Sequence, residues 1–238
     1  MAPLYRVRPR FYTPRPMAHQ DSPARVRALI YDFDDTIVES ERLNDTMFSD
    51  LLRAEYGIEL SLREQEELYG YSWSGVFAWL RDHRGLHYER EAVWARFMEI
   101  KREFLGRTRL RVASGFDRML TLPVPQAIVS GSTRAEITMM LENIGMPAEA
   151  VQFILCDEDG GAGKPHPEGF LSALARLGVP PHETLVFEDS PAGIEAAHRA
   201  GIPVAFVAEM ASRDNADRAD LRFESFLDAW QWVNGRIR

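Results

Sequence analysis

Residues 27 to 36 read RALIYDFDDT, and the first seven of them form a nearly continuous apolar run of strand length. Such a run is typical of a parallel β-strand that is covered on both faces. It passes directly into acidic residues. Because side chains alternate along a strand, Asp32 and Asp34 should leave it on the same side, while Phe33 points to the opposite face.

Similar short apolar runs recur in the second half of the chain. They occupy residues 125 to 129, 151 to 155, 183 to 187 and 203 to 207. The intervals between them carry helix signals, such as the capping box formed by Thr133 and Glu136. Five strands separated by helices predict a doubly wound α/β fold with a five-stranded parallel sheet, in which ligands collect at the carboxyl ends of the strands.

The interval between the first two strands, residues 34 to 124, is much longer than the dozen or so residues that a crossover needs. Four proline-free segments within it have apolar residues at helical spacing, at residues 41 to 56, 61 to 69, 73 to 84 and 89 to 106. They predict an inserted helical cap. The predicted organisation is a flexible tail (1–26), an α/β core (27–38 and 110–238) and a cap (39–109). Four aromatic residues should form the cap core: Trp73, Phe77, Trp79 and Trp94. The break at residues 69 to 74 should face a substrate.

Composition excludes several classes of protein. The chain has 238 residues and a net charge of −8, which argues against a broad basic surface for nucleic acid. It has no apolar run of the roughly 20 residues that cross a membrane. The single cysteine, Cys156, cannot form an internal disulfide, so a reducing cytoplasm fits best. The arginine-rich, acid-free start of the chain also has some features of an organelle leader, but its four prolines oppose the helix that such leaders form.

Polar side chains follow three of the predicted strands. Asp32 and Asp34 repel one another unless a cation lies between them, and a hard divalent ion takes oxygen ligands. Ser130-Gly131-Ser132 ends the second strand and opens a helix, where backbone N–H groups can hold a phosphate. The fourth strand ends in a second acidic pair, Glu188-Asp189. Together the four carboxylates would need a metal ion to be stable.

Lys164 is one of only two lysines in a chain that otherwise uses arginine. It lies in the rigid turn GKPHP just after the third predicted strand, at the end of the sheet where the acidic residues also lie. This position favours a role in the site over that of a surface lysine. The other lysine, Lys101, is expected to lie on a cap helix away from the site, at the surface.

These segments, in this order, resemble the four motifs of the haloacid dehalogenase superfamily. The stretch from residue 163 to 204 is similar to the subfamily with a helical cap between the first two motifs, which includes sugar-phosphate phosphatases and β-phosphoglucomutase. The resemblance covers residues 27 to 232. Asp35 stands where the family usually has glycine, and Glu39 and Glu168 stand where aspartate is usual, which puts no catalytic residue in doubt.

The resemblance implies roles for three catalytic residues. Asp32 would attack phosphorus and form an aspartyl-phosphate, which divides one difficult displacement into two easier ones. Asp34 would protonate the leaving alkoxide and then activate water. Lys164 would offset charge on the nucleophile and the phosphoryl group.

The resemblance also implies the ligands of a metal ion and of the phosphate. Mg²⁺ would be held by the Asp32 side chain, the Asp34 carbonyl and Asp189, with Glu188 ordering bound water. The phosphate oxygens would be held by Ser130, Gly131, Ser132 and Lys164. The expected function is that of an Mg²⁺-dependent phosphatase for a small phosphorylated metabolite, with sugar phosphates as one candidate. We expect no nucleic-acid or membrane partner, and a monomer or weak dimer in the cytoplasm.

Other functions remain open at this stage. A phosphomutase resembling β-phosphoglucomutase should have a histidine twelve residues after the nucleophile, where this chain has Asn44. An imine-forming phosphonate hydrolase needs a cap lysine, and the cap offers only Lys101. A dehalogenase needs no second acid, so Asp34 argues against one. A non-catalytic protein with this fold should have lost Asp32, Asp34 or Lys164, and a receiver-type phosphoacceptor lacks a large cap.

Overall fold

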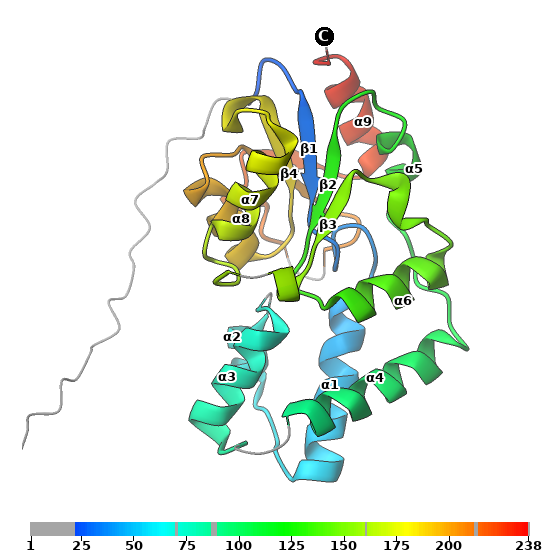
Figure 1. Ribbon diagram of the computed structural model, residues 1–238, viewed down its shortest axis with the longest axis vertical. Coiled ribbons are helices and arrows are strands. Elements are labelled where there is room, and N and C mark those ends of the chain that lie inside the picture. Colours follow the sequence, from blue (N-terminus) through cyan, green and yellow to red (C-terminus); the bar gives the residue numbers. More distant parts are fainter. Residues whose placement is uncertain (1–21, 70, 87–89, 160, 212–213, 238) are drawn as a thin grey trace, which may run out of the picture.

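The computed structural model describes residues 22–69, 71–86, 90–159, 161–211 and 214–237. An α/β part and a group of four helices make up the chain, and the helices lie beyond one end of the sheet (Figure 1). Most of the predicted flexible tail, Gly70 of the predicted substrate-facing break and residues 87–89 lie outside the described residues. Val26, which we assigned to the tail, is fully buried, and its N–H donates to the carbonyl of Arg236 at 3.0 Å.

The sheet has six strands, in the order β3-β2-β1-β4-β5-β6, and every pair is parallel. They are β1 (Ala28–Tyr31), β2 (Gln126–Val129), β3 (Phe153–Leu155), β4 (Thr184–Phe187), β5 (Val204–Val207) and β6 (Leu221–Phe223). The doubly wound fold is confirmed, but the expected number of five strands is wrong. The missed strand, β6, is a three-residue edge strand with Arg222 at its centre, so it has no apolar run to reveal it.

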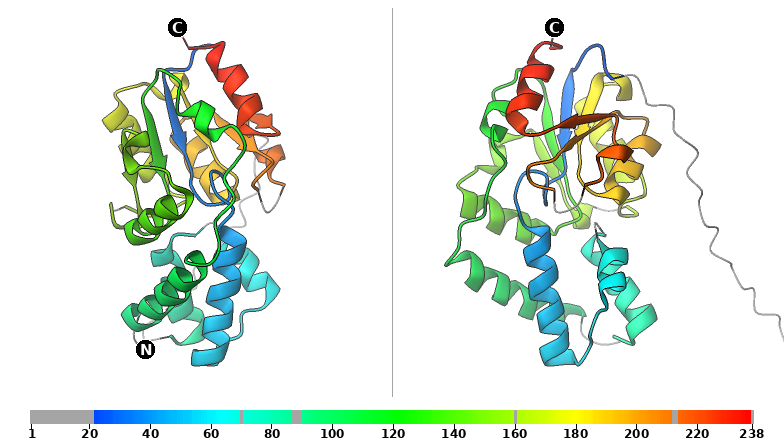
Figure 2. Two further views of the ribbon diagram at one scale, coloured as in Figure 1. Left: turned by 90° about the vertical axis from the view of Figure 1, so that its right-hand side faces the viewer. Right: turned by 180° about the vertical axis from the view of Figure 1, so that it is seen from behind.

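Helices cover both faces of the sheet (Figure 2). One face carries α5 (Phe116–Met119), α6 (Arg134–Ile144) and α9 (Phe226–Asn234), and the other carries α7 (Glu168–Leu177) and α8 (Pro191–Arg199). Residues of β1 alternate between these layers: Leu29 and Tyr31 pack on the first, and Ala28 and Ile30 on the second. This burial on both faces explains the apolar run in the sequence.

The four helices beyond the sheet are α1 (Glu41–Tyr56), α2 (Leu62–Leu68), α3 (Trp73–Arg84) and α4 (Arg90–Leu105). They share a hydrophobic cluster of their own, which includes Phe48, Leu52, Leu80 and Phe97. The chain enters and leaves this group side by side, because Ala113 N–H donates to Ile37 O at 2.9 Å. We call these helices the cap. The exact domain boundaries stay a prediction.

Short 3₁₀ turns complete the described structure, at Ala148–Ala150, Asp157–Asp159, Pro181–Glu183 and Ala216–Arg218. Among the described residues, no helix has both the length and the apolar character that a membrane span requires.

Candidate active site

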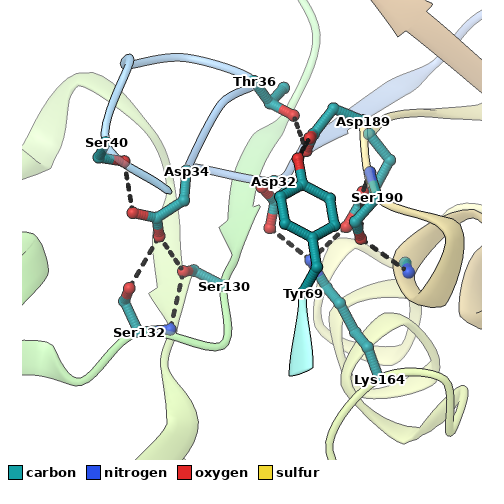
Figure 3. A network of polar contacts seen from close by, with 12 residues as sticks. Asp32, Asp34, Thr36, Ser40, Tyr69, Ser130, Ser132, Lys164, Asp189 and Ser190 are labelled. Carbon is teal, nitrogen blue, oxygen red and sulfur yellow. Dashed lines mark hydrogen bonds and ion pairs between the residues drawn. The ribbon is translucent and has the colours of Figure 1, made fainter. Parts of the chain in front are cut away.

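The carboxyl ends of β1, β2 and β4 meet where the sheet faces the cap. Asp32 directly follows β1, Ser130 follows β2 and Glu188 follows β4. Because β1 lies between the other two strands, the three residues lie at the same edge of the sheet. Figure 3 shows Asp32 and Ser130 there, with Asp189 next to them. The backbone supports the position of Asp32, whose N–H donates to Phe187 O at 2.9 Å.

Lys164 lies among the carboxylates at this edge. Its ammonium contacts carboxylate oxygens of both Asp32 and Glu188, and all three side chains are at least nine-tenths buried. Burial by itself would lower the pKa of Lys164, but the negative charges of Asp32 and Glu188 outweigh it and hold that pKa above its ordinary value. The lysine is therefore positively charged at neutral pH.

Three carboxylates at the edge are placed to share a metal ion. Asp32, Glu188 and Asp189 each offer an oxygen within 4.8 Å of the others. Burial raises the pKa of Asp32 and that of Asp189 well above the ordinary value, and the neighbouring carboxylates raise both further. Lys164 opposes the rise at Asp32. When all are ionised, three carboxylates and one ammonium keep a net charge of minus two, which a divalent cation would neutralise.

Glu188 is fixed by the first turn of α8. Its carboxylate accepts hydrogen bonds from the N–H of Ser190 at 2.7 Å and from the Ser190 hydroxyl at 3.0 Å. The same turn needs a glycine, because a Cβ at Gly193 would lie 1.7 Å from a Glu188 oxygen. The positive end of the helix therefore stabilises a carboxylate whose other oxygen contacts Lys164.

Asp34 lies beside this group of three carboxylates and has its own hydrogen-bond partners. One carboxylate oxygen accepts from the Ser40 hydroxyl at 2.5 Å, and the other accepts from the hydroxyls of Ser132 at 2.7 Å and Ser130 at 3.3 Å. The next residue, Asp35, has a φ of 52°, in the left-handed region that favours glycine. This conformation is the one expected at a position where the family resemblance implies glycine.

The loop after β2 brings the predicted phosphate-binding residues to the same edge. Ser130 and Ser132 are buried, and the N–H of Ser132 donates to the Ser130 hydroxyl at 3.0 Å. The predicted capping box of α6 is confirmed, with Thr133 accepting from the N–H of Glu136. The cap backbone lies against Gly131, where an added Cβ would meet Ser72 Cα at 3.1 Å.

Two further cap residues near the site donate hydrogen bonds to core carboxylates, and the sequence did not predict these contacts. The hydroxyl of Tyr69 donates to a carboxylate oxygen of Asp189 at 2.6 Å. Ser74 donates to the Asp157 carboxylate from its N–H at 3.2 Å and from its hydroxyl at 2.6 Å. Both residues lie in the break at residues 69 to 74, which the sequence analysis expected to face a substrate.

The expectation that Lys101 is a surface lysine is wrong. Lys101 of α4 is 2% exposed, and its ammonium lies 2.7 Å from a carboxylate oxygen of Glu136, which is fully buried in α6. Burial raises the pKa of Glu136, although the charge of Lys101 opposes the rise. We call this contact between α4 and α6 the cap–core contact. Nothing in the helical spacing around Lys101 revealed it, because its partner comes from another part of the chain.

A cavity that is partly open to solvent lies between the cap and the edge of the sheet. Its core wall includes Asp32, Asp34, Lys164 and Asp189, and its cap wall includes Trp73. Trp73 also packs edge to face against Phe48 of the cap core, with ring centroids 5.0 Å apart. The other three predicted cap-core aromatics, Phe77, Trp79 and Trp94, pack in the cap cluster.

Comparison with known proteins agrees with the resemblance drawn from the motifs. Residues 29–207 match the haloacid dehalogenase-like hydrolases, and the chain belongs to this family. Protein CbbY of Rhodobacter capsulatus is 28% identical over 218 residues, which cover 83% of this chain and 92% of CbbY. Fructose-1-phosphate phosphatase YqaB of Escherichia coli is 24% identical over 189 residues, covering 75% of this chain and 94% of YqaB.

Two further comparisons cover very different shares of the chain. Validoxylamine A 7'-phosphate phosphatase of Streptomyces hygroscopicus subsp. limoneus is 39% identical, but over 79 residues, which are 33% of this chain and 37% of that enzyme. The crystal structure of CbbY from Rhodobacter sphaeroides in complex with phosphate superimposes with a TM-score of 0.67 at 21% identity, covering 84% of this chain and 95% of CbbY. This likeness concerns the fold.

Proposed function

We propose that the protein is an Mg²⁺-dependent phosphatase that hydrolyses a small phosphorylated metabolite through an aspartyl-phosphate on Asp32. The observation that carries the proposal is the group of three buried carboxylates around Lys164, beside the hydroxyls of Ser130 and Ser132 and beneath a cap. Membership of the hydrolase family and the phosphatases among its relatives support it.

The buried carboxylates fit the metal. Asp32, the Asp34 carbonyl and Asp189 would hold Mg²⁺, and Glu188 would order its bound water. When bound, the ion supplies positive charge that offsets the charge of the carboxylates and of the phosphoryl oxygens. The excess of negative charge at this edge, with oxygen donors only, is what a hard divalent cation requires.

The first chemical step transfers the phosphoryl group to the protein. A carboxylate oxygen of Asp32 bonds to phosphorus as the bond between phosphorus and the ester oxygen breaks. Asp34 donates its proton to the leaving oxygen, which departs as an alcohol. The Ser130 and Ser132 hydroxyls and the Lys164 ammonium hold and neutralise the phosphoryl oxygens meanwhile.

The second step returns the protein to its starting state. Asp34, now ionised, takes a proton from a water molecule, whose oxygen bonds to phosphorus. The bond between phosphorus and Asp32 breaks, and inorganic phosphate leaves. The Ser40 hydroxyl, which donates to the Asp34 carboxylate and takes no part in holding the phosphoryl group, orients this carboxylate for both proton transfers.

The competing functions find less support in the described residues. A phosphomutase would use a histidine where this chain has Asn44, and an amide cannot act as a general acid or base at neutral pH. An imine-forming hydrolase would need an unpaired cap lysine, whereas Lys101 is buried against Glu136. We therefore adopt neither.

The proposal is tested with p-nitrophenyl phosphate and a panel of phosphate monoesters. We expect hydrolysis that requires Mg²⁺ and is abolished by Asp32→Asn, because an amide is a poor nucleophile. Asp34→Asn should slow turnover by roughly 10²- to 10⁴-fold, the range typical of lost acid–base catalysis. Asp50→Asn, at an exposed position of α1, is the control. Full activity of Asp32→Asn, or activity in excess chelator, would contradict the proposal.

A further inference from the structure

The two walls of the cavity differ in chemistry. The core wall carries the carboxylates and Lys164, which the proposed reaction uses. The cap wall is largely apolar, with Phe48, Leu60, Leu68 and Val76. Hydroxyl and amide groups interrupt it at Ser49, Asn44 and Gln65. The cap wall faces the part of a substrate that is not the phosphoryl group. Its chemistry therefore indicates which leaving groups the site can bind.

Apart from Lys164, the described residues that line the cavity carry no positive charge for a second anion. Among the described residues that line it, Lys164 is the only lysine, arginine or histidine, and its ammonium already contacts Asp32 and Glu188. Among the described residues of the cap wall, the charged one is Asp45, an acidic residue. A second phosphate or a carboxylate would lose its hydration without gaining a cation.

The cap wall can instead bind hydroxyl groups. Asn44 of α1 is 4% exposed, and its amide nitrogen lies 3.5 Å from an Asp34 carboxylate oxygen. Its carbonyl oxygen is buried and accepts no hydrogen bond from any described residue. A hydroxyl donor from a ligand would satisfy this oxygen. Because Asp34 is placed to protonate the leaving oxygen, such a hydroxyl would lie near the phosphorylated carbon.

Aromatic side chains add flat surfaces to the same wall. Tyr71 lines the cavity and is 39% exposed, and Trp73 is half-buried beside it. Their faces suit the apolar face of a sugar ring or of a nucleoside base.

We infer that the site takes monophosphate esters of uncharged, polyhydroxylated alcohols and rejects substrates with a second anionic group. This inference rests on the proposed phosphatase activity and specifies its substrate class.

The test compares two substrates that differ in one group. Glucitol 6-phosphate and 6-phosphogluconate share the phosphorylated carbon and the hydroxyls, but one ends in a CH₂OH group and the other in a carboxylate. We expect kcat/KM to be higher for glucitol 6-phosphate by about tenfold or more, since an uncompensated charge costs at least the 1.4 kcal/mol that a factor of ten represents. p-Nitrophenyl phosphate, measured alongside, reports on the reaction itself.

A variant tests whether the cap wall is the cause. Ser49→Arg places a cation on the half-buried side of α1 that faces the cavity, so it should reduce the preference for glucitol 6-phosphate several-fold. Thr46→Arg adds the same charge at an exposed position of the same helix and should leave the preference unchanged.

The outcomes separate the two claims. The inference would be overturned if kcat/KM were equal for glucitol 6-phosphate and 6-phosphogluconate, or higher for 6-phosphogluconate, while p-nitrophenyl phosphate was hydrolysed normally. The proposed function would then still stand. An equal effect of Ser49→Arg and Thr46→Arg would also overturn it. Absence of Mg²⁺-dependent hydrolysis of every ester would overturn the proposed function itself.

Discussion

Both lysines of this protein are buried against carboxylates, but the two regions differ in net charge. At the edge of the sheet, Lys164 contacts Asp32 and Glu188, and Asp189 adds a third carboxylate. At the cap–core contact, Lys101 meets Glu136 alone, with side chains 3% and 0% exposed. The first region has an excess of negative charge that a cation can neutralise, whereas the second is balanced. The ratio of carboxylates to lysines thus distinguishes a binding site from a structural link.

The largest effect should come from changing the lysine of the unbalanced region. Lys164→Arg replaces a compact ammonium by a wider planar group that does not fit between two carboxylates and a phosphate. We expect kcat to fall by roughly 10²- to 10³-fold, as for other losses of transition-state charge stabilisation. Steady-state kinetics on p-nitrophenyl phosphate measure it, with Arg102→Lys on exposed α4 surface as control. Near-normal kcat would mean that Lys164 has no part in the reaction.

A change in the balanced region should instead lower the free energy of unfolding. Lys101→Met leaves the Glu136 carboxylate buried without its partner, which typically costs about 3–5 kcal/mol. Urea unfolding at neutral pH measures the loss, and Arg102→Met, exposed on the same helix, should change the free energy of unfolding little. The double variant Lys101→Met with Glu136→Gln should recover much of the loss, because no buried charge remains and the amide oxygen can still accept from the Thr133 N–H. A loss in Lys101→Met no larger than in the control would refute the link.

The pH dependence of that loss follows from the raised pKa of Glu136. The folded protein binds the Glu136 proton more tightly than the unfolded chain does, so the cost of ionised Glu136 grows as pH rises through its folded pKa. Lys101→Met removes the charge that opposes this rise, so the carboxyl group becomes neutral at a higher pH. The difference in unfolding free energy between wild type and Lys101→Met should therefore shrink from pH 7 to about pH 5. A difference that is constant or grows on acidification would show that Glu136 is not the cause.

The sequence predicted the core side of the site better than the cap side. Asp32, Ser130 and Glu188 each directly follow a strand, and parallel strands bring their carboxyl ends to one edge, so strand positions alone place these residues together. The cap lacks such a rule. Its helices were predicted within a residue or two of their observed bounds, but helical spacing does not fix which side chains face the core.

The features that the sequence did not predict are those that no local pattern determines. Lys101 and Tyr69 act through partners far away in the chain, Glu136 and Asp189, and the docking of the cap decides both contacts. The edge strand β6 escaped because it is short and half-exposed, so burial imposes no apolar pattern on it. Local pattern thus predicts what the sheet determines, and contacts between the two parts require the structure.

The smallest effect tests whether the two regions are independent, because the cap residue Tyr69 donates a hydrogen bond to Asp189, one of the carboxylates proposed to hold Mg²⁺. Tyr69→Phe keeps the ring but removes the hydroxyl that donates to Asp189. Hydrogen bonds to a ligating carboxylate orient it, and their loss typically weakens metal binding by about 10-fold or more. Calorimetric titration with Mg²⁺ should show this weakening. Tyr71 lines the same cavity, and the Tyr71→Phe variant should bind Mg²⁺ as the wild type does.

The free energy of unfolding of Tyr69→Phe should change less than that of Lys101→Met, since no charge loses its counter-ion. Unchanged Mg²⁺ affinity in Tyr69→Phe would mean that the cap contacts the carboxylates without influencing them, and that cap docking rests on contacts such as the Lys101–Glu136 pair.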